Sequence, residues 1–187
     1  MKSRVLALST LLLAAPASAI GIAGSVQGTA PADLRVSAWA VTPFGQPVAE
    51  LVSAPVTGKS FRLDLPDDAP PARALVPVDN RLSWPGLIDF QKASASAQAA
   101  ELKLFTYRDT NGDGKRQDNE PLREVRAQVG KGELFMVWAS APVTVTASRN
   151  YSADLKKGWN VMTVEVRGSV AVKPLDTKTG LTLNLGQ

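Results

Sequence analysis

The chain has 187 residues, with 21 lysines and arginines against 17 aspartates and glutamates, and it contains neither histidine nor cysteine. The net charge of +4 is small and the basic residues are scattered among acidic ones, which argues against nucleic-acid binding. The lack of histidine and cysteine removes the commonest general base, the thiol nucleophile and the imidazole ligands of zinc and copper.

Residues 1–19 have the pattern of a signal peptide. Lys2 and Arg4 precede an apolar run, and Ala17-Ser18-Ala19 supplies the small side chains that a signal peptidase accepts. We expect cleavage after Ala19, which leaves 19 basic against 17 acidic residues. The run is too short to span a bilayer, no second long run exists, and no cysteine follows to carry a lipid. The mature chain is therefore expected in the periplasm, the cell envelope or the extracellular medium, without a transmembrane span.

Short runs in which apolar and polar residues alternate make up most of residues 20–187, separated by Gly, Pro, Asp and Asn. A period of two predicts strands with one buried face. The expected strands cover residues 24–28, 34–42, 48–54, 60–65, 73–78, 102–107, 122–129, 134–139, 143–149, 161–167, 169–173 and 181–185. About a dozen short strands predict an all-β fold, an antiparallel β-sandwich, because two packed sheets are needed to bury one face of each strand.

Residues 87–100 are the least strand-like segment, because they include a stretch rich in alanine and serine. Alanine favours helix, whereas serine competes for backbone hydrogen bonds and no apolar stripe is present to anchor a helix. A short helix and a linker both remain open. The segment is also the point at which residues 20–187 could divide into two domains.

Residues 109–120 read Asp-Thr-Asn-Gly-Asp-Gly-Lys-Arg-Gln-Asp-Asn-Glu and predict a calcium site. Oxygen donors stand at loop positions one, three, five and twelve, with glycine at six, as a hard cation requires. The expected ligands are Asp109, Asn111, Asp113, Lys115 through its carbonyl, Gln117 directly or through water, and Glu120. Strands are expected on both sides of the loop, so it lacks the helices of an EF-hand.

The alternative interpretation of this loop is a simple turn. Asn111-Gly112-Asp113-Gly114 suits a tight turn equally well. A turn alone, however, does not require Asp109 and Glu120 at ligand spacing. Magnesium is disfavoured, because it tolerates a flexible cage of protein oxygens poorly.

Three segments in the first part of the chain carry a resemblance to known β-sandwich domains. Residues 24–28 and 36–39, followed by the hairpin sequence Gly-Lys-Ser-Phe-Arg-Leu-Asp-Leu-Pro over residues 58–66, resemble transthyretin-like or carboxypeptidase regulatory-like domains. That resemblance covers about a quarter of the chain and implies only a sandwich fold.

Tyr107-Arg108 followed by residues 109–120 resembles the calcium loops of B-repeat domains in bacterial surface adhesins. The twelve-residue length and the final glutamate agree with those loops, whereas Gln117 stands where they often carry aspartate. This resemblance implies a structural calcium ion and a noncatalytic surface or envelope module.

Tryptophans and a basic turn offer further binding hypotheses. Trp138 lies in an apolar run and is expected to be buried, whereas Trp84 and Trp159 lie in predicted loops and are either packed or free to stack on sugar rings. Lys156-Lys157 with Arg149 forms either a basic patch for an anionic polymer or a solvated turn.

No catalytic signature accompanies these features. A carboxylate pair or a serine and lysine pair would be needed, and neither has a recognisable pattern. The sequence therefore predicts an exported, noncatalytic, calcium-stabilised β-sandwich, acting as an accessory or structural subunit of the bacterial cell envelope or surface layer, with envelope or surface proteins as partners. The alternatives are a module that binds carbohydrate or another surface ligand and, third, a secreted enzyme.

Overall fold

The computed structural model describes residues 20–176 and 180–185, and the predicted signal peptide, residues 1–19, lies outside this part of the chain. The described residues form fifteen strands and one 3-10 turn, Ala72–Ala74. The strands are β1 (Gly21–Gln27), β2 (Leu34–Val41), β3 (Pro47–Pro55), β4 (Ser60–Asp64), β5 (Val76–Pro77), β6 (Phe90–Ala93), β7 (Gln98–Arg108), β8 (Arg123–Glu124), β9 (Arg126–Val129), β10 (Gly132–Ala139), β11 (Val143–Ala147), β12 (Tyr151–Leu155), β13 (Gly158–Val166), β14 (Val170–Pro174) and β15 (Leu181–Asn184). The predicted all-β fold is confirmed. No helix in these two described ranges is long and apolar enough to cross a membrane.

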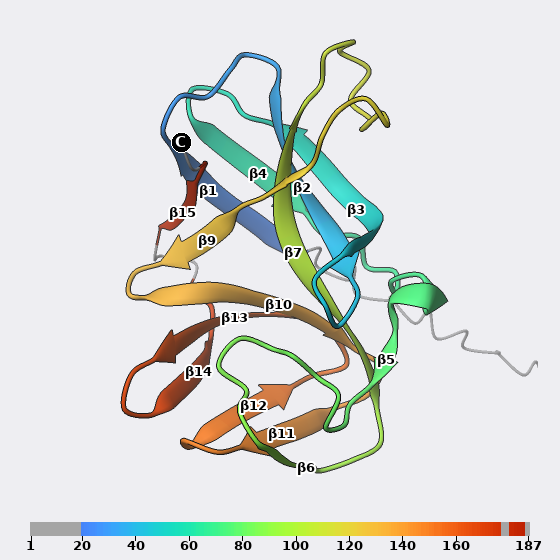
Figure 1. Cartoon of the computed structure of the whole chain (residues 1–187), viewed down its shortest axis with the longest axis vertical. Coiled ribbons are helices and arrows are strands. Elements are labelled where there is room, and N and C mark those ends of the chain that lie inside the picture. The colour runs from blue at the N-terminus through green and yellow to red at the C-terminus, as the bar shows by residue number, and fades with distance from the viewer. Residues whose placement is uncertain (1–19, 177–179, 186–187) are drawn as a thin grey trace, which may run out of the picture.

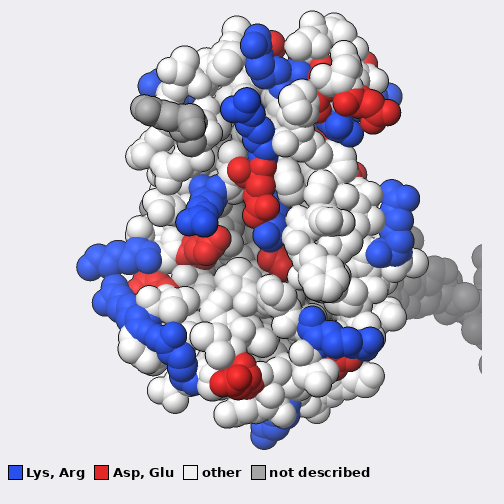
Figure 2. Space-filling model, viewed as in Figure 1, with Lys and Arg blue, Asp and Glu red and all other residues white. Residues whose placement is uncertain are grey.

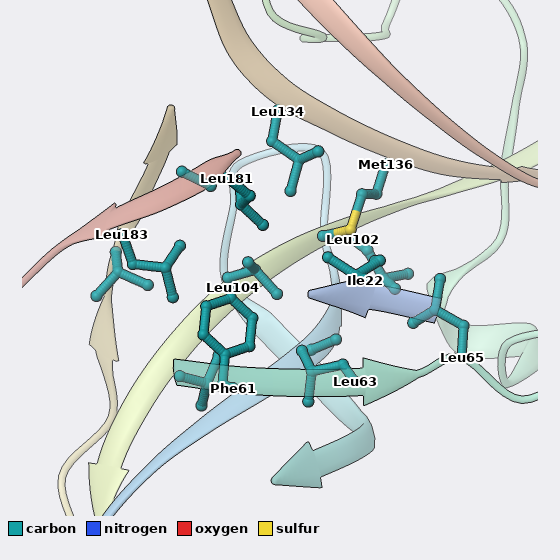
Figure 3. Packing of buried hydrophobic residues seen from close by; sticks show 14 of the residues in the cluster. Ile22, Phe61, Leu63, Leu65, Leu102, Leu104, Leu134, Met136, Leu181 and Leu183 are labelled. Carbon is teal, nitrogen blue, oxygen red and sulfur yellow. The ribbon is translucent and has the colours of Figure 1, made fainter. Parts of the chain in front are cut away.

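Twelve strands form one strongly curved sheet (Figure 1). Its main path runs β3-β2-β7-β10-β9-β15-β1-β4, and β5, β8, β13 and β14 branch from it. The sheet curls until its ends, β3 and β4, lie near each other. Inside the curl lies the first hydrophobic cluster, where leucines from β4, β7 and β15 point toward one another (Figure 3).

The other three strands, in the order β12-β11-β6, form a second sheet, and a second hydrophobic cluster joins it to β10, β13 and β14. Strand β10 borders both clusters: Leu134 and Met136 belong to the first, and Phe135 and Val137 to the second. A strand that is buried on both faces does not need to alternate apolar with polar residues. This explains the uninterrupted apolar run in residues 134–139.

The expectation of a helix or linker over residues 87–100 is wrong. The segment contains β6, and from Gln98 onward it begins β7, the longest strand of the described chain. Ala99 lies in the second cluster and Ala100 in the first. Small side chains suit a strand with a core on each face, so tertiary packing overrides the helical preference of alanine. A division into two domains near this segment stays a prediction.

Other differences are local. The expected strand over residues 122–129 is broken at Val125 into β8 and β9, and the one over residues 143–149 ends at Ala147. Tyr151–Leu155 is a strand that the sequence interpretation missed. Trp159, expected in a loop, lies in β13 opposite Trp138 of β10.

Candidate functional site

The loop of residues 109–120 leaves β7 directly after Arg108 and leads into β8 at Arg123. The loop contains no helix, which confirms that strands flank it. Gly112 and Gly114 have φ angles of +72° and +77°, in the left-handed region that favours glycine. The glycine at loop position six, Gly114, therefore has the left-handed conformation of a sharp turn.

Asp109, at loop position one, is only 7% exposed. Its Oδ2 atom accepts a hydrogen bond from the Gly114 N–H at 2.9 Å and lies 3.6 Å from the Arg35 guanidinium. Its Oδ1 atom is buried and has no hydrogen-bond partner among the described residues. A buried carboxylate oxygen without a partner is costly, and a bound cation is one way to offset that cost.

Glu120, at position twelve, is 1% exposed. Oε1 accepts hydrogen bonds from the N–H and hydroxyl of Thr110 at 2.8 and 3.1 Å, and Oε2 accepts one from the N–H of Gln117 at 2.8 Å. The Gln117 N–H, followed by the Thr110 donors, lowers the pKa of Glu120, so its carboxylate is ionised at neutral pH. The fold thus buries an anion inside the loop and holds its orientation.

Asn111 and Asp113, at positions three and five, each accept a hydrogen bond from a backbone N–H two residues later. Asn111 Oδ1 takes the Asp113 N–H at 3.1 Å, and Asp113 Oδ1 takes the Lys115 N–H at 2.8 Å. The Gln117 amide donates to Asp113 Oδ2 at 2.9 Å. The Lys115 N–H is the largest cause that lowers the pKa of Asp113. These contacts form the tight turn of the alternative interpretation. They do not exclude metal ligation, because Asn111 Oδ1 and Asp113 Oδ1 each accept one of these hydrogen bonds and keep a second lone pair.

The five predicted side-chain ligands and the Lys115 backbone lie in one loop, but their carboxylates are not clustered tightly. In residues 20–176 and 180–185, no three acidic side chains gather closely enough to hold a metal ion by themselves. A calcium ion would need amide and carbonyl oxygens as well, and it would have to draw Asp109, Asp113 and Glu120 together.

Residues outside the loop anchor it to the strands beneath. The Ser53 hydroxyl of β3 donates to the Gly114 carbonyl at 3.3 Å, and it accepts hydrogen bonds from Arg35 and from the Tyr107 hydroxyl. The sequence analysis missed Arg35 and Ser53. They stand 74 and 56 residues before Asp109, and only the pairing of β2 with β3 and β7 brings them under the loop.

No family model, curated protein or solved structure matches the chain. The arguments about function therefore rest on the residues themselves. The resemblances to transthyretin-like and B-repeat domains stay predictions.

The tryptophans are mostly engaged in packing. Trp84 is 5% exposed and lies 5.3 Å from Phe135 between ring centroids, so it is not free to stack on a sugar. Trp159 is half-buried and donates its indole N–H to the Pro66 carbonyl at 2.7 Å. Trp138, expected to be buried, is half-buried in β10.

The basic residues proposed as a patch do not come together. Arg149 precedes β12 and binds the carbonyls of Arg167 and Gly168, whereas Lys156 and Lys157 follow the same strand. The five residues of β12 separate them, and a strand of that length spans about 17 Å. On the face shown in Figure 2, basic and acidic side chains are interspersed, with no wide area of one sign.

Proposed function

We propose that this chain is an exported, noncatalytic β-sandwich protein, stabilised by one calcium ion in the loop of residues 109–120, that serves as an accessory or structural subunit of the bacterial cell envelope or surface. The observation that carries the proposal is the buried Oδ1 atom of Asp109, which has no partner among the described residues. The buried, ionised Glu120 at the other end of the same loop supports it.

The ion would have a structural role at this position. Calcium bound between Asp109 and Glu120 would join the end of β7 to the segment that enters β8, next to the Ser53 anchor on β3. A chain without cysteine has no disulfide to hold such a loop. Strands on both sides also argue against a sensor that opens two helices on binding calcium.

Calcium is expected to raise the melting temperature. At a calcium concentration one hundred times the dissociation constant, binding stabilises the fold by about 2.7 kcal/mol. For a chain of this size, that corresponds to a rise of roughly 5–10 °C in Tm. Differential scanning fluorimetry in calcium and in EGTA measures the difference, and elemental analysis measures bound calcium.

Asp113→Asn and Asp118→Asn form a matched pair for this experiment, because both remove one negative charge from the same loop. Asp118 is fully exposed and stands at position ten, which supplies no expected ligand. The calcium-dependent rise in Tm should shrink in Asp113→Asn and persist in Asp118→Asn. Equal melting temperatures in calcium and EGTA for the natural chain, with no bound calcium, would refute the metal site.

The envelope role is tested by affinity purification of the tagged chain from native envelope fractions. A defined, stoichiometric complex with an envelope or surface protein is the expected result. Recovery of the chain alone from the soluble fraction would contradict this role without affecting the calcium site. A screen for hydrolase and dismutase activity should show none above a heat-denatured control.

A further inference from the structure

A cavity of about 320 Å³ opens at the end of the first hydrophobic cluster, beside the loop of residues 109–120. Leu34 of β2 and Leu185, which follows β15, both pack with the first cluster and line the cavity, and Pro31 and Pro121 extend the apolar lining. Apolar walls with a few polar groups are typical of sites for small molecules.

Arg123 places a positive charge on the inner side of this opening. It pairs with Thr106 across the short ladder between β8 and β7. Directly opposed residues of an antiparallel pair project to the same face. Thr106 is 4% exposed and, two residues after Leu104 on the same strand, faces the core side of the sheet. Arg123 therefore lies at the rim of the inner face of the sheet. Arg123 and Thr106 both line the cavity.

Arg123 is an exposed residue of the cavity lining, and its charge is neutralised by no group in the part of the chain that the structure describes. Arg108 also lines the cavity, but it is paired with Asp33 at 2.7 Å. Glu120 has both carboxylate oxygens hydrogen-bonded to N–H groups of its own loop. The Arg123 side chain has no hydrogen bond or ion pair with any residue in the described ranges 20–176 and 180–185.

We propose that this cavity binds a small monocarboxylate with an apolar body. The carboxylate pairs with Arg123, for which a planar guanidinium is well shaped, and the apolar body lies against Leu34, Leu185 and the two prolines. One unpaired cation matches a single negative charge, and the nearby Glu120 carboxylate opposes a dianion such as a phosphate monoester. The site goes beyond the proposed structural role. Glu120 belongs both to the cavity lining and to the calcium loop, so the site is tested with and without calcium.

Octanoate is the probe for this site, with 1-octanol as its uncharged counterpart. A ligand of about ten heavy atoms is expected to bind with a Kd in the millimolar range. Titration of the full mature chain by two-dimensional NMR, in EGTA and again in calcium, should show saturable binding of octanoate. Binding to Arg123→Gln should be at least about tenfold weaker, as expected when a charged hydrogen-bonded pair is lost.

Two control variants separate the site from general effects. Arg126→Gln removes an exposed arginine three residues away that lines other cavities, and it should leave octanoate binding unchanged. Thr29→Trp, at the exposed rim, should block the cavity without removing the arginine. Equal octanoate affinity in Arg123→Gln and the natural chain, equal affinity for octanol and octanoate, or no saturable binding up to about 20 mM would overturn the proposal. Because the comparison is made in EGTA, its failure is distinct from failure of the calcium site.

Discussion

Glu101 is a residue of β7, two positions after Ala99 of the second hydrophobic cluster and two before Lys103. It lines a cavity together with Trp84. Burial raises the pKa of Glu101 to about 7, the charges of Glu124 and Glu133 act in the same direction, and Lys103 opposes them. The side chain therefore titrates near neutral pH in the folded chain.

The free energy of unfolding should depend on this group. In the unfolded chain Glu101 ionises near pH 4.5, whereas in the folded chain it ionises near pH 7. The folded state therefore binds the proton more tightly than the unfolded state does. The resulting contribution to the free energy of unfolding is fully present below pH 4.5 and is lost as the pH rises through 7. The loss is about 3 kcal/mol at most. Urea denaturation should show Glu101→Gln to be more stable than the natural chain at pH 8, with a smaller difference at pH 5.

Asp67→Asn is the control, because Asp67 is exposed in the proline-rich loop after β4. The free energy of unfolding of Asp67→Asn should vary with pH as that of the natural chain does. If the free energy of unfolding of Glu101→Gln varies with pH in the same way as that of the natural chain, Glu101 does not titrate as described.

Single residues also show where sequence reasoning reaches its limit. The spacing of Asp109 and Glu120 is visible along the chain, and both side chains are indeed buried at the ends of one loop. Arg35 and Arg123 carry no such signal. Their positions depend on strand register, which brings residues together across the sheet and cannot be read from local spacing.

At the scale of elements, alternation predicts most strands because one face is buried and the other is not. The pattern fails where both faces are buried or where the side chains are small. β7 begins with Gln98-Ala99-Ala100, which resembles a helix in composition, yet its partners are β5 and β10. β12 was missed because its alternation of Tyr151, Ala153 and Leu155 with polar residues falls between two turn sequences.

The loop of residues 109–120 is itself an element anchored by tertiary contacts. Its Gly114 carbonyl meets Ser53, and the same hydroxyl receives hydrogen bonds from Arg35 and Tyr107. The sequence predicts which residues of the loop could bind a metal ion. The surface against which the loop packs follows from the strand order β3-β2-β7.

For the whole molecule, β10 is the wall between two hydrophobic clusters, and β7 contributes to both. Unfolding of one cluster would expose one face of β7 and β10, and the second cluster needs these two strands to stay folded. We expect one cooperative transition in differential scanning calorimetry, with equal calorimetric and van't Hoff enthalpies. Two resolved transitions would instead support a division of the chain near residues 87–100.

The parallel pairing of β1 with β15 has a consequence for the order of folding. β15 lies between β1 and β9, so the first described strand obtains its inner neighbour only from residues 181–184. Contacts between segments about 160 residues apart slow folding, because a long loop must close before they form. We therefore expect the curved sheet to close only when β15 is available. A chain that crosses a membrane through a narrow translocation channel must remain unfolded on the way, and late closure of this sheet is compatible with that requirement.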